Sequence, residues 1–162
     1  MSDQNLNDDL NASGVYIIEV LRDGKNGPEV LERRVVPNLV VLSGKKQIWR
    51  MSSGLSANHW GYMRIGTSGG AATGANTNVT SPVTATLKTA TTITLLSGTR
   101  TMQWVVSYPS GAGTKSATNI KEVVVMNSYT TPGGSALSRS TFSAVNKTTA
   151  DKLRITYRAR VT

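Results

Sequence analysis

The chain contains no cysteine and a single histidine among its 162 residues. The lack of cysteine excludes a disulfide framework, thiolate metal ligands and a cysteine nucleophile. Because His59 is the only histidine, the sequence also lacks the multi-histidine sets that hold catalytic zinc. We therefore expect neither a metal site nor a cofactor.

Acidic residues are scarce after the first 32 residues. Residues 1–32 contain seven acidic and two basic residues, a net charge of −5, whereas residues 33–162 contain two acidic and sixteen basic residues, a net charge of +14. A catalytic triad needs an acid beside its histidine, and a glycosidase needs two carboxylates across a cleft. The second region offers only Glu122 and Asp151. The sequence therefore predicts a protein that is not an enzyme.

Long apolar runs are also missing. No stretch approaches the 18 apolar residues that a membrane helix needs, and the polar, acidic N-terminus does not resemble a secretory signal. The glycine-rich residues 66–78 have neither a GK[ST] ending nor a GxGxxG spacing. We expect no membrane contact and a flexible loop at 66–78.

What the chain does contain is a series of short β-branched segments separated by Gly, Pro or Asn. Such a series predicts an all-β antiparallel sandwich or jelly-roll-like barrel, with residues 14–162 as a single domain. Residues 1–13 are expected to form an extended polar arm and residues 14–36 a hairpin. Pro37 is expected to stop the strand, and Asn38 to cap one short helix over residues 38–51. The further expected strands cover residues 59–65, 83–87, 91–96, 101–108, 120–126, 136–143 and 153–161.

The last of these segments alternates with a period of two. Leu153, Ile155 and Tyr157 share one face, while arginines alternate with Thr156 on the other. This pattern is typical of a half-buried strand. It predicts a row of arginine side chains on the open face of a sheet.

Four segments carry a resemblance to a known class of proteins. The first is Asn-Leu-Val at 38–40, followed by Gly44 and the expected helix. The others are residues 62–73 (YMRIGTSGGAAT), 136–142 (ALSRSTF) and 146–157 (NKTTADKLRITY). Their order resembles that of small virion proteins of tailed bacteriophages, in which an IGTG strand end precedes a small-residue loop and a later pair of strands closes the sheet. The chain has Ser68 where that pattern has its second glycine. The resemblance covers residues 38–160 and implies a structural role in the virion, without an active site.

This resemblance favours a capsid decoration, or cement, protein that is assembled in the host cytoplasm and located in the virion. Its expected partners are the major capsid protein and neighbouring copies of itself, as a homo-oligomer. The acidic leading segment is an available partner for the basic body, within one chain or between subunits. The candidate interface residues are Arg33, Arg34, Trp60, Tyr62, Arg154, Arg158 and Arg160.

Three other functions remain as alternatives. The first is a tail, collar or baseplate component. The second is a carbohydrate-binding module that uses Trp60 and Tyr62 as a sugar platform. The third is a nucleic-acid-binding module, which the arginines would suit. Direct nucleic-acid binding is disfavoured, because binders of this kind stack bases on aromatic residues of the basic face, and Tyr157 is expected on the opposite face.

Overall fold

The structure, a computed structural model, describes residues 12–41, 43–46, 60–83, 88–96, 98–99, 101–110, 117–127 and 136–161. The strands within these ranges are β1 (Ala12–Gly24), β2 (Gly27–Val40), β3 (Tyr62–Gly66), β4 (Lys88–Thr89), β5 (Thr92–Leu96), β6 (Thr101–Tyr108), β7 (Ala117–Met126), β8 (Ala136–Lys147) and β9 (Asp151–Val161). The helix in the described part of the chain covers residues 43–46. No helix in these ranges has the length and apolar character needed to cross a membrane.

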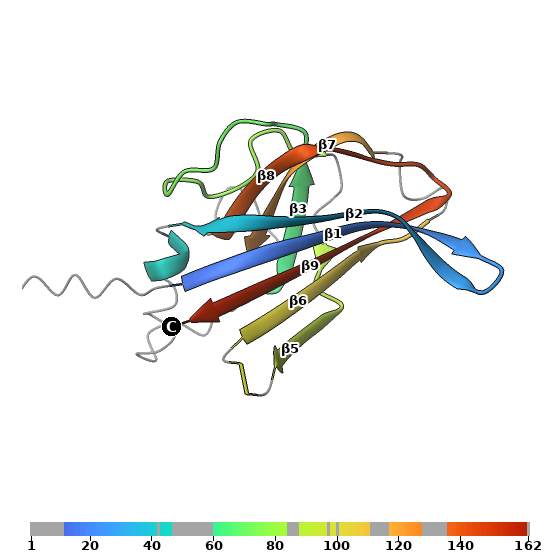
Figure 1. The fold of residues 1–162 in the computed structure, drawn as a ribbon. Helices are drawn as coiled ribbons and strands as arrows, with labels where there is room; N and C mark the ends of the chain where they lie inside the picture. The colour runs from blue at the N-terminus through green and yellow to red at the C-terminus, as the bar shows by residue number, and fades with distance from the viewer. Residues whose placement is uncertain are drawn as a thin grey trace, which may run out of the picture.

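β1 and β2 form the hairpin predicted for residues 14–36. Their antiparallel pairing runs to a two-residue turn at Lys25 and Asn26. Gly27 follows with φ of 112°, a backbone conformation that favours glycine. The tip of this hairpin extends beyond the rest of the molecule (Figure 1). The hairpin prediction is confirmed, and the strands are longer than expected.

The predicted boundary between arm and domain is two residues too late. Ala12 and Ser13 already belong to β1, where they pair with Val161 and Arg160 of β9. The rest of the predicted arm, residues 1–11, lies outside the described residues.

The predicted helix start at Asn38 is wrong, because β2 continues through Pro37 to Val40. β2 pairs with β8 only at Leu39 and Val40. Within the described chain, Pro37 thus lies where one edge of β2 has no ladder partner, and proline is tolerated at such an edge. The helix observed over residues 43–46 falls within the predicted range, and residues 47–51 lie outside the described residues.

The strands form two antiparallel layers that are joined at one corner (Figure 1). One layer has the order β4-β3-β7-β8 and the other β2-β1-β9-β6-β5, with β8 and β2 in contact at the join. At the opposite edge the chain itself crosses between layers, since Ala90 donates to the Gly61 carbonyl and Thr91 to that of Val105. The predicted all-β antiparallel sandwich with one short helix is confirmed.

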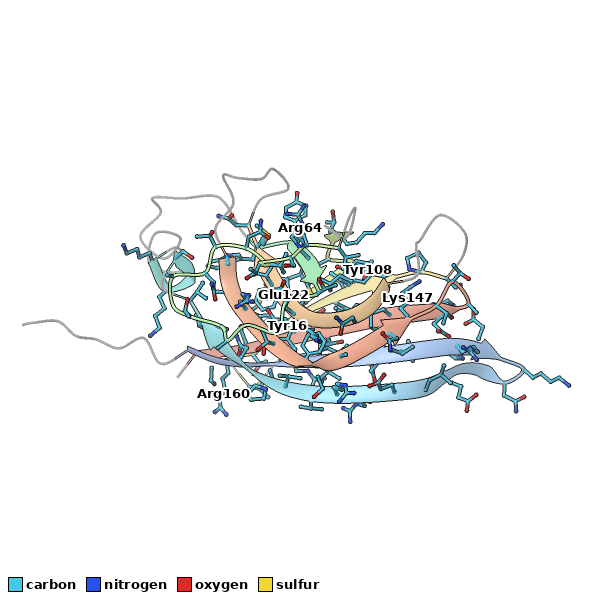
Figure 2. The ribbon with its side chains drawn as sticks, turned by 90° about the horizontal axis from the view of Figure 1, so that it is seen from above. Tyr16, Arg64, Tyr108, Glu122, Lys147 and Arg160 are labelled. Carbon is cyan, nitrogen blue, oxygen red and sulfur yellow. The ribbon has the colours of Figure 1, made fainter. Side chains whose placement is uncertain are left out.

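The main core lies between the two layers, as Figure 2 shows for Tyr16 and Tyr108. Tyr157 stacks between Tyr16, at a centroid distance of 4.6 Å, and Trp104, at 5.4 Å. On β9, Leu153, Ile155 and Tyr157 are fully buried, as their alternation predicts. β9 therefore turns its arginines to the outside of the sandwich.

Candidate functional site

Four of the predicted interface arginines lie on the outer face of the layer that contains β2, β1, β9 and β6. Side chains that are paired across neighbouring strands share a face of the sheet. Arg33, Glu19 and Arg154 are paired in one row, and Val35, Ile17, Thr156 and Val105 in the next. The rows beyond contain Val15, Arg158 and Gln103, and then Ser13, Arg160 and Thr101.

We call this surface the arginine face, defined by Arg33, Arg154, Arg158 and Arg160 around the belt of Val35, Ile17, Thr156 and Val105. Val35 is 57% exposed. A shallow hollow of about 330 Å³ lies over the belt, between Arg33, Arg154 and Arg158. Figure 2 shows Arg160 pointing away from both layers. The face combines four cations with a belt in which Val35 is exposed, Ile17 and Val105 are half-buried and Thr156 is buried. Cations around an exposed apolar side chain suit an acidic protein surface.

Part of this positive charge is neutralised within the chain. Glu19 lies between two arginines, with its carboxylate 2.9 Å from Arg154 and 3.6 Å from Arg33. Arg158 donates to Gln103 at 2.8 Å. The predicted use of the acidic leading segment as an internal partner is confirmed at Glu19. Among the described residues, Arg158 and Arg160 have no carboxylate partner and remain available to another molecule.

The other three predicted interface residues lie elsewhere. Arg34 is on the opposite face of β2, where it contacts Glu32 at 2.5 Å and the Ala144 carbonyl at 3.4 Å. Trp60 is buried in the core, and its carbonyl accepts a hydrogen bond from the Trp104 indole at 2.8 Å. Only 6% of Trp60 is exposed, which leaves little surface for the predicted interface role. Tyr62 lies on the other layer and is half-buried.

The sequence did not predict the most elaborate polar site. On the outer face of the other layer, Glu122 of β7 and Arg139 of β8 form a buried ion pair at 2.6 Å. The segment between β3 and Pro82 covers this pair as an Ω-loop whose ends meet, with Thr67 donating to the Ser81 carbonyl. We call residues 67–81 the Ω-loop.

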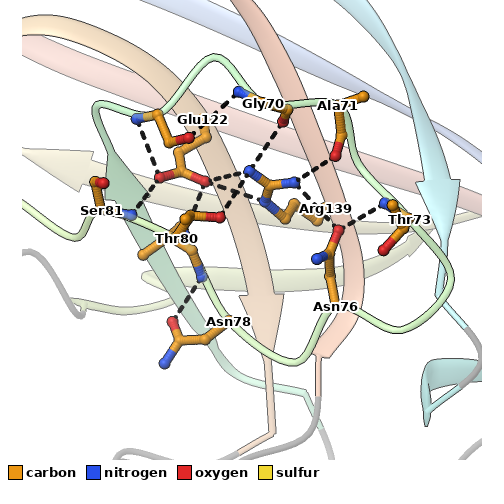
Figure 3. Close-up of polar contacts among 11 residues, drawn as sticks. Gly70, Ala71, Thr73, Asn76, Asn78, Thr80, Ser81, Glu122 and Arg139 are labelled. Carbon is orange, nitrogen blue, oxygen red and sulfur yellow. Dashed lines mark hydrogen bonds and ion pairs between the residues drawn. The ribbon is translucent and has the colours of Figure 1, made fainter.

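Backbone groups of the Ω-loop bind both charges (Figure 3). Glu122 accepts N–H hydrogen bonds from Ser81 at 2.9 Å, Thr80 at 3.0 Å and Ser68 at 3.3 Å. The Arg139 guanidinium donates to the carbonyls of Gly70 and Ala71, to the Asn76 side chain and to the Thr80 hydroxyl. The loop that was predicted to be flexible is thus attached to the sheet along its length.

Burial by itself would raise the pKa of Glu122, but the N–H groups of Ser81 and Thr80 and the Arg139 guanidinium outweigh it and hold the pKa below its usual range. The carboxylate stays charged and has its acceptor positions filled. It is therefore unsuited to proton transfer, and the pair fixes the loop. The sequence carries no clear signal for this pair, since Glu122 follows Lys121 and Arg139 lies between two serines.

The two carboxylates of the basic body, Glu122 and Asp151, have separate sets of partners. Asp151 is bound to Arg22 at 2.8 Å and accepts from the Thr148 hydroxyl at 2.6 Å. The Thr148 hydroxyl, above all, lowers the Asp151 pKa. The described residues contain no cluster of three or more potential metal ligands. His59 lies outside them.

The chain matches no protein-family model, no curated protein and no solved structure.

Proposed function

We propose that this protein is a non-enzymatic structural component of a tailed-phage virion, and that it decorates the capsid shell. The observation that carries the proposal is the arginine face, on which Arg158 and Arg160 have no carboxylate partner among the described residues and lie near the exposed Val35. The resemblance of residues 62–73, 136–142 and 146–157 to small virion proteins favours a structural role in the virion. The partners in this proposal are the major capsid protein and neighbouring copies of the chain.

The proposed mechanism is adhesion. The valines and isoleucine of the belt supply apolar area, and the arginines around them select an acidic capsid surface and orient the protein on it. A rigid sandwich suits this task because the cross-strand pairs hold the cations in fixed positions. Bridging adjacent capsid subunits would add buried area to a shell that is under internal pressure.

Two features disfavour the non-virion alternatives. The aromatic side chains of Tyr157 and Trp104 point into the core, so the described part of the arginine face has no stacking platform for bases. Trp60 is buried, which removes the tryptophan of the sugar platform. A tail, collar or baseplate location remains as the second candidate within the virion, because the same face would suit an acidic tail protein.

The test measures binding of the purified protein to particles that lack it, by co-sedimentation. We expect Arg158→Glu with Arg160→Glu to weaken binding at least tenfold, since both substitutions place carboxylates against an acidic surface. The matched control is Lys25→Glu with Lys46→Glu, which makes the same change in net charge at exposed positions away from the face. Equal loss of binding in both variants would overturn the role of the face.

Micrographs of assembled particles then give the location. Density over the whole shell supports decoration. Density at a single vertex supports the tail alternative, and particles without the protein would contradict a virion role.

A further inference from the structure

The two layers separate beside the corner at which they are joined. β2 and β8 are paired only through Leu39 and Val40 of β2. Next to this short ladder lies a cleft of about 380 Å³. It is lined by Arg33, Arg34, Val35, Val36, Phe142 and Ser143.

The cleft has an apolar floor and a basic rim. Val36 and Phe142 are partly buried and pack against the main core. Arg33 and Arg34 lie at the rim, where Glu19 at 3.6 Å and Glu32 at 2.5 Å neutralise part of their charge. The Arg34 Nε atom is buried and has no hydrogen-bond partner. A buried donor without an acceptor is costly, and a carboxylate or carbonyl in the cleft would satisfy it.

Two strand edges border this cleft. Over the described residues, β2 from residue 28 to 38 has β1 on one side and no ladder partner on the other. β8 from residue 141 to 147 is paired with β7 alone. Two side chains bridge the gap, with the Ser140 hydroxyl donating to the Pro37 carbonyl at 2.8 Å and Arg34 to the Ala144 carbonyl at 3.4 Å. Such edges accept an added extended segment through backbone hydrogen bonds.

We propose that the occupant of the cleft is residues 1–11 of a neighbouring copy of this chain, added as a strand. This segment contains three aspartates and no Lys or Arg, which complements the basic rim. Leu6 and Leu10 are four residues apart, so in an extended conformation both side chains point to the same face. In that conformation Leu6 and Leu10 can reach the apolar floor, and Asp8 lies between them on the same face, where the Arg34 Nε atom lacks an acceptor. Asp9 points to the other face.

The position of β1 favours a neighbouring copy over the same chain. β1 lies on the side of β2 opposite the cleft, between β2 and β9. Gly14 pairs with Asn38, close to the C-terminal end of β2. Ala12 comes two residues before Gly14 in the chain, so the segment that precedes it starts from that end of β2. To reach its own cleft, the segment would have to reverse and pass around that end, where Val41 and Ser43 donate hydrogen bonds to the carbonyls of Leu137 and Ala136 of β8. A segment of this length spans about 36 Å when extended, enough to reach another copy.

This inference concerns contacts between copies and does not depend on the capsid role. If the arginine face fails to bind particles, the exchange of N-terminal strands still stands. If the exchange fails, the arginine face still stands.

Disulfide trapping tests the proposal on the full chain, which has no cysteine of its own. The variant Leu6→Cys is mixed with Ser143→Cys, an exposed position in the cleft lining. Mild oxidation is followed by mass spectrometry of the cross-linked peptides. We expect a disulfide between positions 6 and 143 at a yield at least tenfold above that for the control pair of Leu6→Cys with Thr94→Cys, an exposed position on β5.

A second comparison isolates the apolar contact. Adding Leu10→Asp to the Leu6→Cys chain should lower the yield at least fivefold, whereas Asn7→Asp adds the same charge on the other strand face and should leave it unchanged. Circular dichroism confirms that each variant is folded. The proposal is overturned if positions 143 and 94 trap equally, or if a Leu6→Cys/Ser143→Cys double variant forms only disulfides within one chain.

Discussion

At Gly66, the last residue of β3, there is no room for a side chain. A methyl group there would meet the Glu122 carboxylate and the Ser81 carbonyl. Because backbone on one side and a saturated ion pair on the other leave little freedom to move, we expect Gly66→Ala to lower the free energy of unfolding by about 2 kcal/mol. Urea denaturation measures this difference.

Gly74 provides the control for this prediction. It lies in the same Ω-loop, and an added methyl group would have nothing within 4 Å. Gly74→Ala should change the free energy of unfolding by less than about 0.5 kcal/mol. Equal losses in the two variants would contradict the close approach at Gly66.

Glu122 leads to a prediction about acid stability. Replacing it by Gln leaves Arg139 buried without a counter-charge, and we expect a loss of about 3 kcal/mol at pH 7. Since the folded pKa is below its usual range, this contribution is present above the unfolded pKa of about 4.3 and is lost as pH falls through the folded pKa. The stabilities of wild type and Glu122→Gln should therefore converge below about pH 4.

Asp23→Asn is the matched carboxylate substitution at an exposed pair. Asp23 contacts Lys152 at 2.7 Å with 58% of its side chain exposed. An ion pair of this kind contributes little, so its pH profile should follow the wild type. Some acid sensitivity remains in Glu122→Gln, because the Asp151 pKa is also lowered. A constant gap between wild type and Glu122→Gln from pH 7 to 3 would contradict the assignment.

Among the strands, β9 and β5 differ most in their surroundings. β9 is paired with β1 on one side and β6 on the other, and its inward side chains are fully buried. β5 is paired with β6, and four of its five residues are exposed. We expect backbone amides of β9 to exchange with deuterium roughly 100-fold more slowly than those of β5. Exchange of β5 as slow as that of β9 would count against this order of strand stability.

The strands and the Ω-loop also show how much of the fold could be predicted from the sequence. The alternation in β9 is a local pattern of period two, so its buried and open faces were predicted correctly. The sequence led us to expect that the strand ends at Pro37. Proline is tolerated there because, within the described chain, one edge of β2 has no ladder partner at that position. This is a tertiary feature that the local sequence does not reveal. The attachment of the Ω-loop was missed for a related reason. It joins Glu122 and Arg139 to residues at least 41 positions away along the chain, and local spacing contains no signal for such pairs.

At the scale of the whole molecule, the ionisation of the buried tyrosines should report whether water has entered between the two layers. Burial raises the pKa of Tyr16 and Tyr108, and raises that of Tyr157 to about 12. Because these folded values exceed the unfolded value of about 10, the stability they provide is complete below pH 10 and is lost as pH rises toward the folded values. We expect their ionisation, followed at 295 nm, to coincide with the loss of the β circular dichroism signal.

Tyr157→Phe refines this test, because it removes one phenol from the stack while keeping the ring. The absorbance step that accompanies unfolding should become smaller by one phenolate. Ionisation of all three tyrosines near pH 10 with the dichroism intact would show that the layers admit water.

The central position of β9 also has a consequence for the order of events during translation. Of the strands that the structure describes, β9 is the last to leave the ribosome, yet it lies between β1, the first, and β6. Until it emerges, the inward faces of Tyr16 and Trp104 lack the Tyr157 ring that stacks between them. Pairings between such distant segments form slowly. We therefore expect the nascent chain to remain open, and in need of protection from aggregation, until residue 161 has left the ribosome.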